Sequence, residues 1–383
     1  MKEKDYIAFG KPNFSAEEIT AVGHVMESGW IGMGAETLAF EDELSQYIDV
    51  PHVVTVNSCT SGLFLSLLAA GVEEGDEVIC PSLTWCSTAN AALYLKASPI
   101  FCDIDPHTLC TDLDSILGCV TEKTRAVIVV HYGGYVVDVA ELRDRLPTSV
   151  EIIEDAAHAF GGRYADGKVV GASGNLTCFS FYANKNLSTG EGGAIALNNV
   201  VQAQKLRRLR QHALPIDAWK RYSSRNDVLL SNNLTELGYK MNYTDLQACI
   251  GRVQLRRFNI MQKIRSELVD FYSESLANTG LILQDKCRDN SHAKHLFVFY
   301  SDEKEIIYDR GSLVLKLRER NIGASIHYTP LHLMELYGHP EALQPLPITE
   351  RISRSLVTLP ISASITKEQA VYVVNNLLEI LNL

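Results

Sequence analysis

Residues 176–193 read Leu-Thr-Cys-Phe-Ser-Phe-Tyr-Ala-Asn-Lys-Asn-Leu-Ser-Thr-Gly-Glu-Gly-Gly, and this stretch decides the fold. The apolar run from Leu176 to Phe181 is typical of a buried strand. Lys185 follows almost at once, and the glycines after it leave the backbone free to turn. A lysine just past a buried strand lies where open α/β sheets bind ligands, and desolvation there makes an amine more nucleophilic. The alternative interpretation is a surface lysine beside a glycine turn.

Around this stretch, short β-rich runs alternate with helical segments. About seven strands are predicted, at residues 53–56, 77–80, 99–103, 126–130, 150–153, 176–181 and 193–197. This alternation predicts an α/β fold with a mostly parallel sheet covered by helices on both faces. Functional residues should gather at the carboxyl ends of the strands. The candidates there are Thr60, Ser61, Trp85, Asp155, His158, Ser180 and Lys185.

The pattern changes beyond residue 245. We predict helices at 245–276, at 311–320 and from Thr366 onward, and strands at 295–300 and 322–328. The sequence therefore predicts a large α/β domain at 1–245, which includes an N-terminal arm, and a smaller α+β domain at 246–383. The polar stretch 212–239 predicts an ordered loop or lid.

Composition excludes several classes of protein. The chain has 383 residues and a formal net charge of −11, which argues against a nucleic-acid-binding surface. Its nine cysteines form no CxxC pair, which argues against a disulfide framework or a zinc site and favours a reducing compartment. The N-terminus shows no signal peptide, and no apolar run reaches the roughly 18 residues of a membrane span. We therefore expect a cytoplasmic protein without a membrane or metal partner.

Two short segments predict ligand contacts. Residues 57–62 lie between a strand and a helix and suit an anion, although Thr60 or Ser61 could simply cap the helix. Asp155 ends another strand and has His158 three residues on, so the pair could face a cation or a protonated heterocycle. A metal would need further ligands that the sequence does not offer. The alternative is an Asp N-cap beside a packed histidine.

Together these pieces describe a site for pyridoxal phosphate. That cofactor needs an amine for a Schiff base, an acid opposite its ring nitrogen, a phosphate cradle and an aromatic group over the ring. Lys185 would supply the amine and then act as the base that moves a proton, and Asp155 would supply the acid. The cradle and the stacking group would come from Thr60, Ser61 and Ser180, and from Trp85 or His158.

With these residues in this order, the chain resembles the DegT/StrS-type sugar aminotransferases, which are fold-type I pyridoxal-phosphate enzymes. The resemblance runs nearly end to end. It rests on Ser28-Gly-Trp-Ile-Gly32, Gly75-Asp-Glu-Val-Ile79, Pro81-Ser-Leu-Thr-Trp85, Ile153-Glu-Asp-Ala-Ala-His-Ala159, Phe179-Ser-Phe181 before Lys185-Asn186, Gly190-Glu-Gly-Gly193 and Gly238-Tyr-Lys-Met-Asn-Tyr-Thr-Asp245.

The resemblance implies an aspartate-aminotransferase-like fold, with a seven-stranded large domain and a small C-terminal domain. It also implies a homodimer with its active sites at the subunit boundary. It assigns the Schiff-base role to Lys185, the ring-nitrogen contact to Asp155 and ring stacking to Trp85, with His158 nearby. The phosphate would be held by Thr60, Ser61, Ser180 and, from the other subunit, Asn242. Substrate would meet Trp30, Trp85, His327 and Tyr328, although the Trp30 loop could also be a plain turn.

Relatives with histidine in place of the lysine are dehydratases, so Lys185 favours transamination. We therefore predict transfer of an amino group, with glutamate as donor, to a nucleotide-linked 4-keto sugar. Such a reaction serves amino-sugar synthesis for a surface polysaccharide, lipid A or an antibiotic. A cyclitol ketone or a 3-keto sugar is the alternative substrate, and a pyridoxal-phosphate-binding regulator without catalysis is the alternative class.

Overall fold

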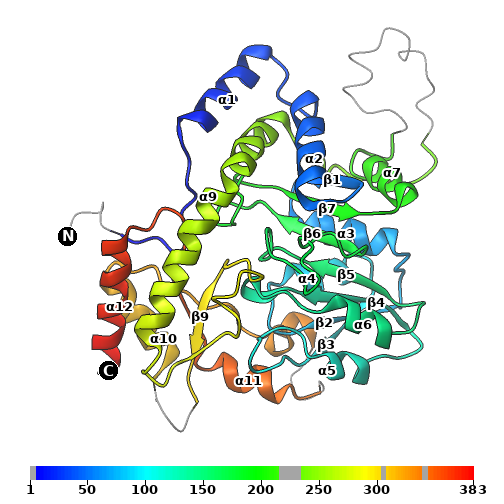
Figure 1. The fold of residues 1–383 in the computed structure, drawn as a ribbon. Helices are drawn as coiled ribbons and strands as arrows, with labels where there is room; N and C mark the ends of the chain where they lie inside the picture. Colours follow the sequence, from blue (N-terminus) through cyan, green and yellow to red (C-terminus); the bar gives the residue numbers. More distant parts are fainter. Residues whose placement is uncertain (1–5, 215–233, 303–307, 339–343) are drawn as a thin grey trace.

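The computed structural model describes residues 6–214, 234–302, 308–338 and 344–383. A seven-stranded sheet with the order β1-β7-β6-β5-β4-β2-β3 forms its centre (Figure 1). The strands are β1 (His52–Val56), β2 (Glu77–Pro81), β3 (Ser98–Cys102), β4 (Thr124–Val130), β5 (Glu151–Asp155), β6 (Leu176–Ser180) and β7 (Gly193–Leu197). β7 is antiparallel to both of its neighbours, and the other strands run parallel to one another. The predicted mostly parallel α/β sheet is therefore confirmed.

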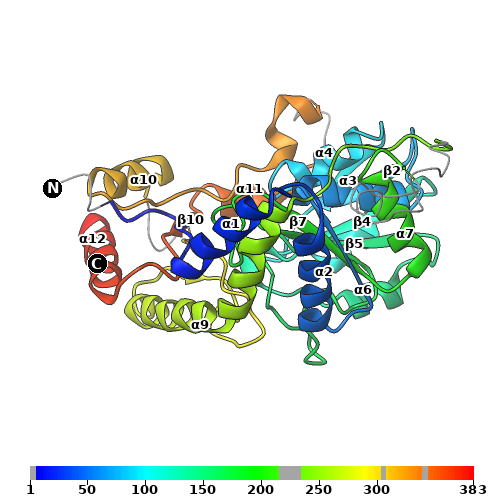
Figure 2. The same cartoon turned by 90° about the horizontal axis from the view of Figure 1, so that it is seen from above.

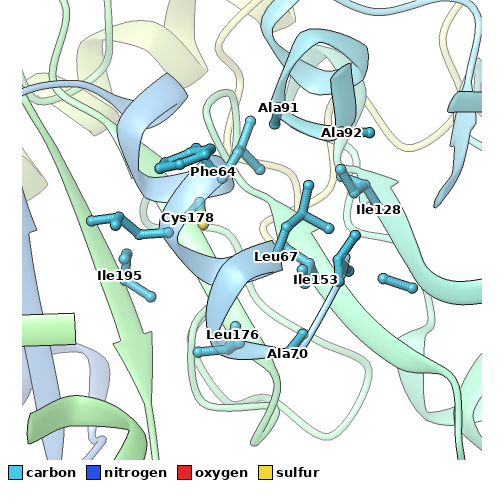
Figure 3. Packing of buried hydrophobic residues seen from close by; sticks show 14 of the residues in the cluster. Phe64, Leu67, Ala70, Ala91, Ala92, Ile128, Ile153, Leu176, Cys178 and Ile195 are labelled. Carbon is cyan, nitrogen blue, oxygen red and sulfur yellow. The ribbon is translucent and has the colours of Figure 1, made fainter. Parts of the chain in front are cut away.

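Helices cover both faces of this sheet, and successive strand residues supply the two cores. Ile128 and Cys178 point into one core, where α3 packs, whereas their neighbours Val127 and Phe179 point into cores on the opposite face. Figure 3 shows α3 and α4 packing their apolar side chains onto the first of these faces. The helices of this part are α1 (Ala16–Ser28), α2 (Ala35–Ile48), α3 (Cys59–Ala69), α4 (Ser87–Leu93), α5 (Leu113–Gly118), α6 (Val139–Arg145) and α7 (Val200–Leu209), with a 3₁₀ turn η2 (Tyr132–Gly134) after β4.

A second, three-stranded antiparallel sheet with the order β10-β9-β8 lies in the C-terminal part. Its strands are β8 (Ile282–Leu283), β9 (Phe297–Tyr300) and β10 (Val357–Leu359). The helices are α9 (Asp245–Leu276), α10 (Arg310–Glu319), α11 (Pro347–Ser353) and α12 (Lys367–Leu381), with 3₁₀ turns η4 (Leu331–Leu333) and η5 (Glu335–Tyr337). The core beneath this sheet takes side chains from α9, α10 and α12, which Figure 2 shows together on one side of the molecule.

The strand predicted at 322–328 is wrong. Ile322 bridges to Ile7 of the N-terminal arm, whereas Ser325 bridges to Thr358 in β10. Because the two ends of the segment pair with different partners, no continuous ladder forms. The third strand of the small sheet is instead the three-residue β10.

The helix starts predicted at residues 245 and 366 are confirmed, and a third helix start is built in the same way. Complete capping boxes open α1 at Ser15, α9 at Thr244 and α12 at Thr366. The domain boundary after residue 245 coincides with the start of α9, which packs on α1 and α2 and also on α12. That boundary stays a prediction. Most of the predicted 212–239 loop, residues 215–233, lies outside the described residues.

Across the described ranges, no helix is both long and apolar enough to cross a membrane.

Candidate active site

A cavity of about 520 Å³ opens at the carboxyl ends of the parallel strands, where ligands bind in open α/β sheets. Its walls come from the start of α3, the segments after β2, β5 and β6, and a segment of the C-terminal part. The predicted site residues that line it are Thr60, Trp85, Asp155, His158, Ser180, Lys185, His327 and Tyr328. Residues far apart in the sequence are therefore gathered around one space, as the strand-end prediction requires.

Lys185 lies in a tight turn after β6, where its backbone N–H donates to the carbonyl of Tyr182 at 2.9 Å. Its Nζ is 3.5 Å from Nε2 of His295. Burial lowers the pKa of the amine to about 8, although the nearby Cys59 and Asp155 act in the opposite direction. Near neutral pH a useful fraction of Lys185 is therefore the free amine, the form that attacks a carbonyl carbon.

Asp155 ends β5 with a buried carboxylate held from two sides. Its Oδ2 accepts from the hydroxyl of Thr88 at 2.8 Å, and its Oδ1 accepts from the backbone N–H of Ala157 at 3.2 Å. Burial raises the pKa of Asp155 despite these bonds. Within the described residues no Lys, Arg or His side chain lies within 4.0 Å of this carboxylate. A buried acid without a cationic partner fits the protonated ring nitrogen of the cofactor.

The N-terminus of α3 faces the same cavity. Ser58 caps it by accepting from the N–H of Ser61 at 3.1 Å, so the alternative in which Thr60 or Ser61 caps the helix is wrong. The Ser61 hydroxyl donates to Asn57 Oδ1 at 2.6 Å, and Ser61 does not line the cavity. Thr60 and Ser180 do line it, and the helix dipole favours an anion there.

Neutral rings form one wall. The Nδ1 of His158 accepts from the N–H of Gly133 at 3.3 Å, and its Nε2 lies 3.1 Å from the Tyr328 hydroxyl. Burial, together with the charge on Lys185, keeps the pKa of His158 well below its usual range and lowers that of His327 to about 3. Trp85 is 59% exposed, and its ring centroid is 5.7 Å from that of Tyr328. The cavity therefore offers flat, uncharged surfaces to an aromatic ring.

Two predicted residues lie elsewhere in the single subunit. Trp30 lines a different cavity of about 770 Å³ beside α1, α2 and α9. Asn242 donates from its Nδ2 to the carbonyl of Tyr243 at 2.8 Å and does not line the Lys185 cavity. Within one chain, neither Trp30 nor Asn242 therefore reaches the cavity that holds Lys185.

Sequence reasoning missed several residues of the site. Polar side chains on the cavity wall that were not predicted are Thr84, Ser87, Asn184 and Glu191. His295, which contacts Lys185, was treated only as the start of a strand. The sequence carries no local signal for this contact, because His295 and Lys185 are 110 residues apart.

Comparison with known proteins agrees with this geometry. Residues 12–378 match the model of the DegT/DnrJ/EryC1/StrS aminotransferase family. The spore coat polysaccharide biosynthesis protein SpsC of Bacillus subtilis is 40% identical over 349 residues, which are 89% of each chain.

Solved structures agree as well. The aminotransferase TlmJ of Streptoalloteichus hindustanus has a TM-score of 0.86 at 31% identity, and the match covers 97% of this chain and 98% of that one. The sugar aminotransferase Spr1654 of Streptococcus pneumoniae in its PMP form has a TM-score of 0.89 at 28% identity, with 98% and 99% covered. The chain belongs to the DegT/DnrJ/EryC1/StrS family and is a pyridoxal-phosphate-dependent aminotransferase.

Proposed function

We propose that this enzyme transfers an amino group from L-glutamate to a nucleotide-linked 4-keto sugar. Family membership gives amino transfer to a sugar, and the name of the relative SpsC connects that protein to polysaccharide synthesis. The observation that carries the proposal is a buried lysine whose pKa falls to about 8, in one cavity with a buried aspartate. Pyridoxal phosphate supplies the electron sink that stabilises a carbanion at the substrate carbon.

Each polar group of the cavity has a proposed role. Lys185 holds the cofactor and, once free, carries the proton removed from the donor carbon. Asp155, fixed by Thr88 and Ala157, stabilises positive charge on the ring nitrogen. Thr60 and Ser180, with the α3 dipole, hold the phosphate. His158 and Trp85 pack against the ring, and His327 with Tyr328 borders the substrate entrance.

We propose a homodimer in which the active sites are shared. Asn242 and Trp30 do not reach the Lys185 cavity of their own subunit, and Trp85 at its rim is 59% exposed. In a dimer, Asn242 of one subunit would add to the phosphate contacts that Thr60, Ser61 and Ser180 make in the other subunit. Trp30 would border the substrate bound in that other subunit. A nucleotide sugar is made and used in the cytoplasm, where we place the enzyme.

A two-step spectral experiment tests this function. Glutamate added to the cofactor-loaded enzyme should convert the absorbance of the lysine-bound cofactor into that of the amine form. A panel of ketones is then added, comprising nucleotide-linked 4-keto sugars, 3-keto sugars and a cyclitol ketone. Recovery of the first spectrum with a 4-keto sugar supports the proposal, and recovery with only a 3-keto sugar or a cyclitol ketone contradicts it.

A further inference from the structure

His295 reaches the active site from the C-terminal part of the chain through a close backbone contact. The N–H groups of His295 and Leu296 donate to the carbonyl of Gly133 at 3.0 and 2.9 Å, and Ala293 donates to Gly134 at 2.8 Å. Gly134 has a φ of +112°, and a Cβ there would lie 2.8 Å from the backbone nitrogen of Lys294. Because no side chain fits at this position, the glycine turn after β4 lets the segment approach.

Asn186 fixes which ring nitrogen of His295 carries the proton. The Nδ2 of Asn186 donates to the carbonyl of Ala293 at 2.6 Å, which directs its Oδ1 toward the ring. That oxygen lies 3.1 Å from the Nδ1 of His295, so Nδ1 must be the donor. In the neutral ring Nε2 then carries a lone pair, and the group 3.5 Å from this lone pair is Nζ of Lys185.

The surroundings keep the His295 ring neutral. It is only 3% exposed, and its centroid lies 4.5 Å from that of His158. Burial lowers its pKa well below the usual range, and Lys185, His158, Arg265 and His327 act in the same direction. The charged or titratable groups around Lys185 are Asp155, Cys59, His158, His295 and His327. Among these groups, His295 is the one hydrogen-bonded to the amine.

We propose that His295, oriented by Asn186, is a positioning residue that accepts a hydrogen bond from the free amine of Lys185 and holds it at the cavity wall. The amine is free from the point where the donor displaces it in the first half-reaction until the product leaves in the second. Held there, it stays close to the carbon from which it must take a proton. The inference rests on the proposed role of Lys185 as the cofactor lysine.

Two amide variants separate this role from a structural one. His295→Gln can place an amide oxygen near the position of Nε2 and keep the acceptor for Lys185. His295→Asn is shorter, so its amide can still contact Asn186 but leaves Lys185 without a partner. Both remove the ring, so any effect of lost packing is common to the two.

The experiment measures the pKa of Lys185 directly in the full-length chain without cofactor. Trinitrobenzenesulfonate is applied across a pH series, and the modification of Lys185 is followed by peptide mass spectrometry. The exposed Lys263 of α9, whose side chain is 79% accessible, is the internal reference. Circular dichroism shows whether each variant is folded.

A hydrogen bond to the charged amine favours its protonated form. We expect wild type and His295→Gln to give a pKa near 8, and His295→Asn to give one lower by about half to one pH unit. Equal values in wild type and His295→Asn, or equal changes in the two variants, would overturn the proposal. Repeating the labelling with pyridoxal phosphate separates the two claims. Protection of Lys185 supports its role as the cofactor lysine, and lack of protection overturns that role whatever His295 does.

Discussion

At the scale of single residues, Lys185 is the first to test. Lys185→Ala removes both the attachment point for the cofactor and the group that carries the proton. We expect transfer from glutamate to fall by at least about 10³-fold, measured as kcat in a coupled assay. Lys168, which pairs with Asp166 on an exposed loop, is the matched control. Lys168→Ala should keep wild-type activity, and a Lys185→Ala enzyme that kept most of its activity would exclude the assignment.

Asp155 and Glu154 are adjacent buried acids with different expected roles. Asp155→Asn keeps the shape of the side chain and its bond from Thr88 but loses the charge. A neutral pyridine is a poor electron sink, so we expect a loss of about 10²-fold or more in kcat, with little change in the free energy of unfolding. Loss of stability without loss of activity would show that Asp155 is a structural acid.

Glu154 on the same strand is expected to stabilise the fold. Its carboxylate accepts from His131 at 2.8 Å, from Tyr164 at 2.6 Å, from Asn175 at 2.9 Å and from Ser173. Burial alone would raise its pKa, but the hydrogen bonds from His131, Ser173 and Tyr164 and the electrostatic effect of His131 lower it overall. A depressed pKa contributes stability above the unfolded-state pKa, and that stability is lost as the pH falls through the folded-state value.

Glu154→Gln replaces one acceptor oxygen with a donor that faces other donors. We expect the free energy of unfolding at pH 7 to fall by about 1–3 kcal/mol. In urea unfolding series from pH 7 to pH 3, the difference from wild type should shrink once the pH falls below the ordinary glutamate pKa of about 4.3. Below it the unfolded wild-type chain takes up a proton that the folded chain, with its lowered pKa, does not. A difference that grows with acidity would contradict this account.

At the scale of elements, one helix caps another. α2 begins after Gly34, which has no side chain to cap it. Asp245, the first residue of α9, accepts instead from the N–H of Gly34 at 2.7 Å and from the N–H and hydroxyl of Thr37 at 2.9 and 2.7 Å. The start of the long helix therefore also fixes the start of α2.

Asp245→Ala should lower the free energy of unfolding by about 2–3 kcal/mol, since it leaves several buried donors without a charged acceptor. Chemical denaturation measures this. Asp270→Ala, on the exposed side of α9 where the carboxylate pairs with Arg288 at 3.1 Å, is the control and should change stability by less than about 1 kcal/mol. Similar losses in the two variants would contradict the capping role.

Prediction from sequence succeeded for elements with strong local patterns. α9 was predicted at its observed bounds from its sustained apolar repeat, and the structure adds a capping box at Thr244 that fixes its start. β10 was missed because its three residues carry too little pattern, and the strand predicted at 322–328 failed because its partners lie far away in the sequence. The alternative considered at α3 named Thr60 or Ser61 as the cap rather than Ser58, since serine and threonine are both good caps and position alone does not decide.

The site shows the same division. Lys185 and Asp155 could be found because Asp155 ends one strand and Lys185 closely follows another, and strand ends share one edge of the sheet. His295 could not, because 110 residues separate it from Lys185 and no local pattern brings them together.

At the scale of the whole molecule, the shared site predicts complementation between inactive subunits. Lys185→Ala and Asn242→Ala should each be poorly active alone. If Asn242 serves the neighbouring subunit, random mixing gives hybrid dimers with one intact site, and the mixture should recover about a quarter of wild-type activity. Light scattering should show a dimer for each variant. Recovery no greater than the mean of the two separate activities would place Asn242 in its own subunit.

The backbone bonds between Gly133–Gly134 and residues 293–296 have a mechanical consequence. They fasten the segment before β9 to the seven-stranded sheet, so it belongs to the frame of that sheet although it follows residue 245 in sequence. If the C-terminal part swings during turnover, it cannot rotate as one rigid block from residue 246 onward. Residues 293–296 can leave the sheet only if these bonds break, so the ring that contacts Lys185 stays with the sheet.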